Sequence, residues 1–286
     1  MRKLIVPQKY NNKKLNTFIL ASFPELSINM LNKALRQKDI RINGVRTKEN
    51  VNIYENDEIA VFIADEYLFS KPSIGKIFED ENILVVNKPN GIEVVSDDAS
   101  KSLTTILQEE YEFIKPCHRL DRNTTGLVLF AKNEEALNIL LEKFKQKEIK
   151  KYYKCVVYGI PKKQADTLVA YLFKDSKKSM VYISDVPKTG YKKIVTSYKV
   201  LETNMKNNTS TLEVLLEYSG RTHQIRAHLA HAGFPIIGDG KYGKNEINKK
   251  FGKKTQELTS YKLVFAFKTE SGILNYLKDK VFEIQN

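Results

Sequence analysis

The sequence predicts an α+β fold, in which a small α/β domain precedes a larger domain built on a mainly antiparallel or mixed sheet. At 286 residues the chain is long enough for one substantial core and a smaller appendage. After residue 76, many short apolar runs follow one another with few helical patterns and no regular alternation. An aperiodic stretch containing Ser, Pro and Gly separates the two parts. We therefore expect domains at residues 1–65 and 76–286, joined by a linker at 66–75.

A helix and a hairpin are expected in the first domain. Ser27 is a suitable helix N-cap, and Ile28, Leu31 and Leu35 recur at helical spacing to form one buried stripe. The Asn43-Gly44 pair is a strong signal for a tight hairpin turn. Basic side chains lie off the stripe and beside the turn, namely Lys33, Arg36, Lys38, Arg41 and Arg46. A basic helix beside a basic hairpin could bind a polyanion. The alternative is that these side chains are only exposed to solvent and bind nothing.

Six strands and one long helix are expected in the second domain. The strands are predicted from apolar runs bounded by turn residues, at residues 83–86, 126–131, 153–158, 194–201, 210–217 and 263–267. The helix is predicted at residues 134–147, because four large apolar residues recur there at helical spacing and Asn133 is a plausible cap.

Charge and cysteine content limit the class of protein. Lys and Arg number 47 against 34 Asp and Glu, which gives a net charge of +13 and predicts a polyanionic partner, most plausibly a nucleic acid. A merely Lys-rich soluble protein is the alternative. Cys117 and Cys155 lack the spacing of a zinc site or of a disulfide framework. No apolar run suits a signal peptide or a membrane span, so we expect a cytoplasmic monomer that uses no membrane, no metal and no cofactor.

Polar residues gather in three segments of the second domain, HRLD at 118–121, KKYYK at 150–154 and GRTHQIRAH at 220–228. Each could be structural by itself. Asp121 is the acid that stands out, and a guanidinium facing it would keep it ionised. An ionised carboxylate can act at an electron-poor carbon such as a sugar C1′. The sequence lacks HExxH, CxxC, GxGxxG and a Walker lysine loop. The remaining possibility is a reaction on a nucleic acid that uses one essential acid and neither a metal nor a cofactor.

Four motifs occur in order between residue 77 and about residue 245, and together they resemble the motifs of the RluA-type pseudouridine synthases. They are EDENILVVNKPNG, HRLDRNTTG, KKYYKCVVYG and GRTHQIRAHLAHAGFPIIGDGKYG. The start of the chain resembles the S4 RNA-binding domain through Leu15, residues 24–27, the Leu31 and Leu35 spacing and the turn at 42–44. This combination implies a synthase acting on large-subunit (23S-type) ribosomal RNA. The C-terminal tail departs from the family pattern, with Leu258-Thr259-Ser260 in place of Leu-His-Ala.

The resemblance implies a role for each matching residue. Asp121 would be the nucleophile, Tyr153 would stack on the flipped base and serve in removal of the C5 proton, and Arg226 would pair with Asp121. Ile225 would line the base pocket, and Arg119 would fill the space that the flipped base leaves in the RNA. Arg221, His223 and Gln224 would form an RNA-facing turn, although His223 could equally be a structural histidine.

Several alternatives stay open at this point. The resemblance does not distinguish attack at C1′ or at C6 from a glycal route. The same reaction on transfer RNA, or a non-catalytic factor that binds ribosomal RNA, would fit the same residues. Binding through the first domain would use Lys33, Arg36, Lys38, Arg41 and Arg46.

Overall fold

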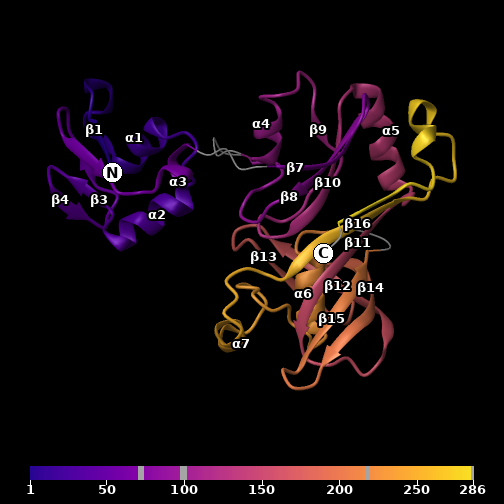
Figure 1. Cartoon of the computed structure of the whole chain (residues 1–286). Helices are drawn as coiled ribbons and strands as arrows, with labels where there is room; N and C mark the ends of the chain where they lie inside the picture. Colours follow the sequence, from indigo (N-terminus) through magenta and orange to yellow (C-terminus); the bar gives the residue numbers. More distant parts are fainter. Residues whose placement is uncertain (70–73, 97–101, 217–219, 285–286) are drawn as a thin grey trace. The chain divides into compact units, whose positions relative to one another are not determined.

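The computed structural model describes residues 1–69, 74–96, 102–216 and 220–284, and the chain divides into two compact units, Met1–Ser73 and Ile74–Asn286 (Figure 1). The first unit contains a four-stranded antiparallel sheet in the order β1-β6-β3-β4 and a two-stranded pair, β2-β5. Its elements are β1 (Arg2–Ile5), η1 (Gln8–Tyr10), β2 (Lys13–Lys14), α1 (Leu15–Ser22), α2 (Ile28–Gln37), β3 (Ile40–Ile42), β4 (Val45–Thr47), β5 (Asn52–Ile53), β6 (Glu58–Val61) and α3 (Asp65–Phe69).

Helix α2 and the β3–β4 hairpin form where the sequence predicts them. The Ser27 hydroxyl accepts a hydrogen bond from the Met30 N–H at 3.2 Å, and Leu31 and Leu35 are buried. Asn43 and Gly44 both have positive φ, as a tight turn between twisted strands requires. The capping residue, the apolar spacing and the turn residues thus act locally, before any tertiary contact is needed.

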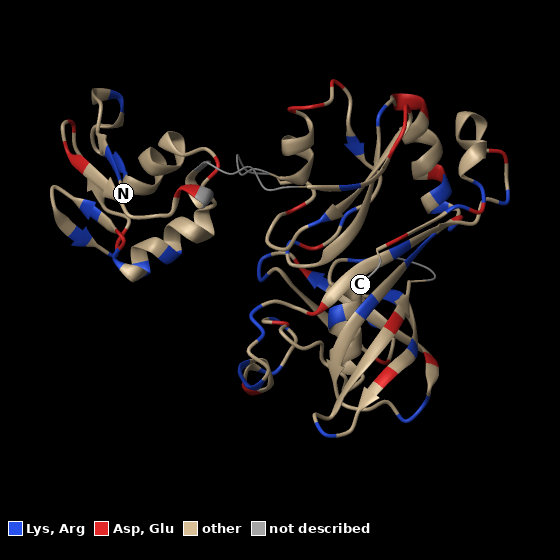
Figure 2. Ribbon diagram, viewed as in Figure 1, with Lys and Arg blue, Asp and Glu red and all other residues tan. Residues whose placement is uncertain are grey.

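The five basic residues expected to bind a polyanion lie on α2, at its C-cap, and on β3 and β4, and further Lys and Arg residues lie elsewhere in the unit (Figure 2). Lys33, Arg36, Lys38 and Arg46 are exposed, as expected. Arg41 is half-buried instead, because β3 is paired on both sides and the guanidinium lies 4.7 Å from the centroid of the Phe62 ring.

The stretch expected to be a linker contains structure at both ends. Helix α3 occupies Asp65–Phe69, and the first strand of the second unit begins at Gly75. Residues 70–73 lie outside the described part of the chain. Loss of apolar periodicity in the sequence thus does not exclude a helical turn in this stretch.

The second unit is organised around an 11-stranded sheet in the order β13-β12-β14-β15-β11-β16-β10-β8-β7, with β17 beside β16 and β9 beside β10. The pairings are antiparallel except β10 with β16, which is parallel, so the mixed and mostly antiparallel sheet expected from the sequence is confirmed. The strands are β7 (Gly75–Glu79), β8 (Ile83–Lys88), β9 (Lys115–Pro116), β10 (Thr125–Ala131), β11 (Ile149–Tyr158), β12 (Ala165–Asp175), β13 (Met180–Ser184), β14 (Lys192–Asn204), β15 (Thr209–Leu215), β16 (Leu258–Phe265) and β17 (Val281–Glu283). The helices are α4 (Leu103–Leu107), α5 (Glu134–Lys145), α6 (Gln224–His231), α7 (Asn245–Lys250) and η2 (Gly272–Leu277).

Strands at the centre of this sheet are buried on both faces, because helices and loops pack on each side. In β8, Leu84 and Val86 belong to one apolar cluster, whereas the alternate residues Ile83 and Val85 belong to another. Helix α5 packs on the second of these faces, and its N-cap Asn133 accepts a hydrogen bond from the Ala136 N–H at 2.8 Å. The continuous apolar runs that predicted the strands follow from this two-sided burial.

All six expected strands are present, but five further strands were not expected. These are β7, β9, β12, β13 and β17, which are short or lie toward the sheet edge and are half-exposed. Strand β16 also begins five residues before its expected start, because the polar residues Thr259 and Ser260 pair with β10. Glu217, the expected end of another strand, lies outside the described residues.

Candidate active site

Hydrogen bonds to backbone groups fix the loop that carries Asp121. Lys88, at the end of β8, is fully buried, and its ammonium donates to the carbonyls of Pro89, Ile92 and Arg122 at 2.8–2.9 Å. Arg122 Nε donates to the Gly91 carbonyl at 3.0 Å, and the Gly91 N–H donates back to the Arg122 carbonyl. The loop therefore presents Asp121 from a fixed backbone between β9 and β10.

Arg226 joins Asp121 to a second, buried carboxylate. Its Nη1 lies 2.9 Å from Asp121 Oδ2, while Nε and Nη2 donate to the two oxygens of Asp239 at 2.7 and 3.0 Å. Asp239 is fully buried and also accepts the N–H groups of Lys241 and Tyr242. The structure thus brings together the Asp121–Arg226 pair that the sequence analysis expected, and adds Asp239, which it missed.

The pKa values of Asp239 and Arg226 are set by the competition between burial, which disfavours their charges, and pairing, which favours them. Burial alone would raise the pKa of Asp239, but the hydrogen bonds and charge of Arg226 outweigh it and hold that pKa below its usual value. Burial would lower the pKa of Arg226, yet Asp239 and Asp121 raise it above its ordinary value. Two carboxylates share one guanidinium, Asp121 at 2.9 Å and Asp239 at 2.7 Å.

His223 is the N-cap residue of helix α6 and has a left-handed conformation, with φ of 54°. Its Nδ1 lies 2.8 Å from the Tyr242 hydroxyl, which itself accepts the Val181 N–H at 2.9 Å. The hydroxyl proton is therefore free to go to Nδ1, which leaves the ring proton on Nε2, 3.9 Å from Asp121 Oδ2. Burial lowers the pKa of His223, as do Arg226 and Lys241, and favours this neutral ring. One edge of the imidazole is thus structural, and the other faces Asp121.

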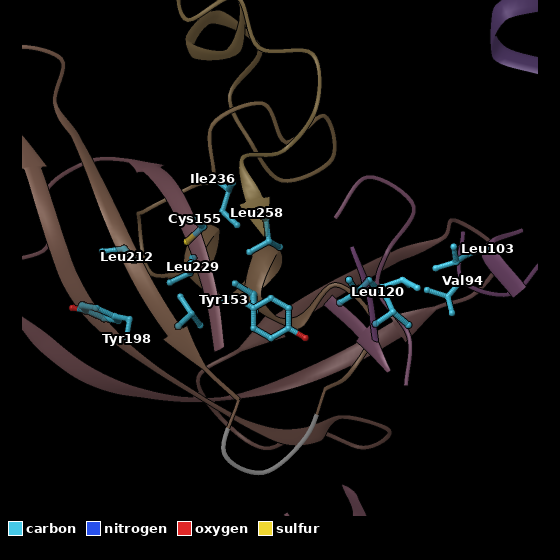
Figure 3. Packing of buried hydrophobic residues seen from close by; sticks show 14 of the residues in the cluster. Val94, Leu103, Leu120, Tyr153, Cys155, Tyr198, Leu212, Leu229, Ile236 and Leu258 are labelled. Atoms are coloured by element: carbon cyan, nitrogen blue, oxygen red, sulfur yellow. The ribbon is translucent and has the colours of Figure 1, made fainter. Parts of the chain in front are cut away.

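Tyr153 projects from β11 into the space beside Asp121. Its side chain is buried between Leu258 and Leu120 in the main apolar cluster (Figure 3). Burial and the charge of Asp121 raise the pKa of Tyr153, so the side chain is a neutral phenol. The neighbouring Tyr152 does not line the pocket and instead lies under the Lys262 ammonium, 4.5 Å from its ring centroid.

An open pocket of about 90 Å³ contains all eight catalytic and substrate-binding residues expected from the sequence. They are Arg119, Asp121, Tyr153, Arg221, His223, Gln224, Ile225 and Arg226. Three separate segments supply them, because β11 lies two strands from β10 and α6 follows β15. Arg119 and Arg221 are exposed at the rim, whereas Ile225 is buried and apolar.

Gln224 differs from the RNA-facing position expected for it. It is 2% exposed, and its amide nitrogen donates to the Val195 carbonyl at 3.0 Å and to Thr196 Oγ1 at 3.2 Å. Its side-chain oxygen accepts the Arg221 N–H, so Gln224 links the turn that precedes α6 to strand β14 by hydrogen bonds. The five basic residues proposed from the first unit belong to that unit and lie outside this pocket.

The pocket also contains residues that sequence reasoning did not single out. They are Leu120, Thr124, Lys151, Leu216, Gly220, Thr222 and Leu258. Lys151 could have been found, because it precedes Tyr153 by two residues on a strand and so shares its face. Leu258 and Thr124 lie where β16 and β10 begin side by side, a parallel contact that no local pattern indicates.

Metal-binding clusters and membrane-spanning helices are not found in residues 1–69, 74–96, 102–216 and 220–284. No group of three or more His, Cys, Asp and Glu side chains in those ranges is placed to hold a metal ion. Nor does any helix in them have the length and apolar character to cross a membrane.

Comparison with known proteins identifies the family. The family model described as RNA pseudouridylate synthase matches residues 82–231, which include the pocket segments around Asp121, Tyr153 and Arg226. The ribosomal large subunit pseudouridine synthase C of Rickettsia bellii is 32% identical over 82% of this chain and 84% of its own. An uncharacterized RNA pseudouridine synthase of Mycoplasma capricolum is 32% identical over 98% of this chain and 96% of its own.

A solved structure agrees at the level of the fold. The human RNA pseudouridylate synthase domain containing 1 has a TM-score of 0.57 at 22% identity, covering 75% of this chain and 91% of that one. With the family match over half the chain and the relatives over most of it, the protein belongs to the RNA pseudouridylate synthase family and is an isomerase that forms pseudouridine in RNA.

Proposed function

We propose that this protein converts uridine to pseudouridine in large-subunit ribosomal RNA, with Asp121 as the nucleophile. The observation that carries the proposal is the Asp121 carboxylate, held 2.9 Å from Arg226 at the wall of an open pocket that Tyr153 also lines. The relative from Rickettsia bellii is named for large-subunit ribosomal RNA, which supports the substrate class.

The reaction rearranges bonds within one nucleotide. The N1–C1′ bond breaks, the uracil turns, a C5–C1′ bond forms, and the proton lost from C5 is balanced by one gained at N1. Asp121 is suited to the attack, because Arg226 holds its carboxylate at 2.9 Å at the wall of the pocket, and Asp239 holds Arg226. Any bond that Asp121 forms to the nucleotide breaks again before the product leaves, so the carboxylate is regenerated and the isomerisation needs no other reactant.

The remaining pocket residues are suited to hold a base that has left the RNA stack. The neutral ring of Tyr153 offers a stacking face, and Ile225 offers an apolar floor. Arg119 is exposed at the rim, where a planar guanidinium could take the place of the extruded base. Tyr153 is also proposed to serve in removal of the C5 proton.

For the first unit we propose an S4-like RNA-binding domain, attached to a catalytic domain that begins near residue 75. The five basic residues proposed to bind RNA lie on or beside one helix and the hairpin that follows, and four of the five are exposed. Phosphate contacts from these side chains would supply affinity without reading the base. The protein is proposed to act as a monomer.

Release of tritium tests the nucleophile. Transcripts of large-subunit ribosomal RNA labelled at uracil C5 should lose label to water with the wild-type protein, and Asp121→Asn should release none. Asp185→Asn is the matched control, because Asp185 is exposed and its partner is His231, outside the pocket. Release by Asp121→Asn at the control rate would overturn the assignment.

Mapping of pseudouridine in cells tests the RNA class. A strain that lacks the protein should lose pseudouridine at specific positions of its large-subunit ribosomal RNA, and the wild-type gene should restore them. Loss confined to transfer RNA would replace the substrate. Loss from no RNA would favour a binding factor without activity.

A further inference from the structure

Lys151 is a cation in the catalytic pocket to which the reaction outlined above gives no role. It precedes Tyr153 by two residues on β11, and both side chains line the pocket with Asp121. Its Nζ lies 3.3 Å from the position that a Cβ on Gly220 would take, so the ammonium reaches the opposite wall of the pocket. The absence of a side chain at Gly220 leaves room for it.

Among residues 1–69, 74–96, 102–216 and 220–284, no carboxylate pairs with this ammonium. Within the described ranges, Lys151 Nζ has neither a hydrogen bond nor an ion pair, and its contact is the Phe144 ring at 5.3 Å. The pocket's carboxylate, Asp121, is already bound to Arg226. Burial lowers the pKa of Lys151 to about 8. A partly buried charge without a partner costs free energy, which an incoming anion would recover.

The other cations of the pocket differ from Lys151 in this respect. Arg226 is neutralised by two carboxylates, and Arg119 and Arg221 are exposed to solvent. Lys151 is therefore a half-buried cation beside the ring of Tyr153 that can still pair with an incoming anion. A uracil ring is neutral, and the full negative charges of RNA are on its phosphates, one on each side of every nucleotide.

We propose that Lys151 binds a backbone phosphate adjacent to the target uridine and so fixes the nucleotide whose base lies against Tyr153. The inference rests on the proposed function, since it takes RNA as the occupant of the pocket. The contact would be formed with the substrate already in its ground state, and its loss would appear mainly in KM and Kd.

The test combines protein and RNA variants that remove the same interaction from either side. Lys151→Met keeps an unbranched side chain without its charge, Lys151→Arg keeps the charge, and Lys150→Met removes one charge from the exposed neighbour on the opposite face of β11. The probe is an RNA of about 20 nucleotides, centred on a uridine that the wild-type protein converts, with one neutral methylphosphonate at the phosphate 5′ or 3′ of that uridine. Circular dichroism and thermal unfolding show that each variant is folded.

Lys151→Met should raise KM and Kd about tenfold, as expected for a hydrogen-bonded charge pair, and Lys151→Arg should recover most of the loss. The slope of log K against log salt should fall by about 0.7–0.9 relative to the wild type and to Lys150→Met. One of the two methylphosphonates should weaken wild-type binding about tenfold but weaken Lys151→Met no further.

Two results would overturn the inference. If each methylphosphonate raised the Kd of Lys151→Met by the same factor as it raises the Kd of the wild type, Lys151 and the phosphate would not interact. A fall in kcat at constant KM would place the charge on the reacting base instead. If the wild-type protein converted no uridine, the proposed function would fail. The effect of Lys151→Met on Kd and on its salt dependence, compared with that of Lys150→Met, would still decide the role of Lys151.

Discussion

At the scale of single residues, the site depends on how Arg226 divides its donors. Three of its nitrogens are used, two of them on Asp239 and one on Asp121. Asp239 is fully buried and cannot exchange this partner for water. It therefore fixes the direction in which Nη1 points at Asp121, and acts on the reaction through Arg226.

Asp239→Asn should damage both stability and turnover. The amide has one acceptor oxygen for two guanidinium donors, so a buried charge loses part of its compensation, at a cost of about 3–5 kcal/mol. Urea unfolding should show this loss, and kcat/KM should fall while the equally conservative Asp185→Asn changes neither. Rescue of kcat/KM by the Asp239→Glu variant would identify a positioning role. A variant with unchanged stability would show that Asp239 is not needed to hold Arg226.

The desolvated ammonium of Lys151 makes stability depend on pH. Burial lowers its pKa from 10.5 to about 8, so between these values the unfolded chain binds a proton that the folded chain does not. The free energy of unfolding should therefore rise with pH across this window. Lys88, whose pKa burial also lowers to about 8, contributes in the same direction.

Lys151→Met isolates one of these two contributions. The variant should be more stable than the wild type at pH 7, by up to about 3 kcal/mol, and the difference should shrink as pH approaches 10.5. Urea unfolding at intervals between pH 7 and pH 10 measures both. A constant difference across the window would show that Lys151 is not desolvated.

The sequence predicted residues of the site that carry their own signal. Asp121, Tyr153 and Arg226 each occur in a polar segment within an otherwise apolar pattern, so their segments could be named before the strands that unite them were known. Asp239 and Lys88 carry no such signal. Their roles depend on burial against distant backbone and side-chain groups, which is a property of the tertiary structure.

At the scale of elements, the parallel contact of β10 with β16 places the Asp121 loop. Thr125 and Gly126 pair with Thr259 and Ser260, and a Cβ on Gly126 would lie 2.2 Å from the Ser260 carbonyl oxygen. Gly126 also has φ of 108°, a conformation that L side chains rarely adopt. Only glycine allows the two strands to approach so closely directly after the loop.

Gly126→Ala should therefore destabilise the second unit by about 3 kcal/mol or more, through both strain and overlap with backbone. Gly91→Ala is the matched control, because Gly91 has φ of 84° but nothing within 4 Å of its added Cβ. That variant should lose only about 1 kcal/mol. Equal losses in thermal or urea unfolding would mean that strain alone, and not the close approach, determines the requirement at Gly126.

Helices and strands with a cap or an apolar pattern in their own sequence were predictable. Strands that form only by pairing with a neighbouring strand were not. Helix α2 has its cap and stripe, and β8 and β10 have continuous apolar runs. Strands β12 and β13 instead form a half-exposed pair at the sheet edge, where alternation is interrupted by charged residues such as Lys174 and Asp175. Their strand conformation depends on pairing with β14, which the sequence does not show.

At the scale of the whole molecule, the net charge of +13 favours association with RNA at low salt. Lys and Arg occur in both units (Figure 2). A charge excess spread in this way predicts affinity but not which residues contact phosphate. Individual contacts must be separated by comparing the salt dependence of matched variants.

The double variant Arg41→Ala, Arg46→Ala should weaken RNA binding with little change in turnover at saturation. The two residues face each other across β3 and β4, and removing two phosphate contacts should lower the slope of log K against log salt by about 1.4–1.8. Because Arg41 also packs on Phe62, thermal unfolding must show that the variant is folded. Lys145→Ala with Lys163→Ala removes the same charge from exposed positions of the second unit and should leave the slope nearly unchanged. Lost turnover at saturation with an unchanged salt slope would place the two arginines in the reaction rather than in RNA binding.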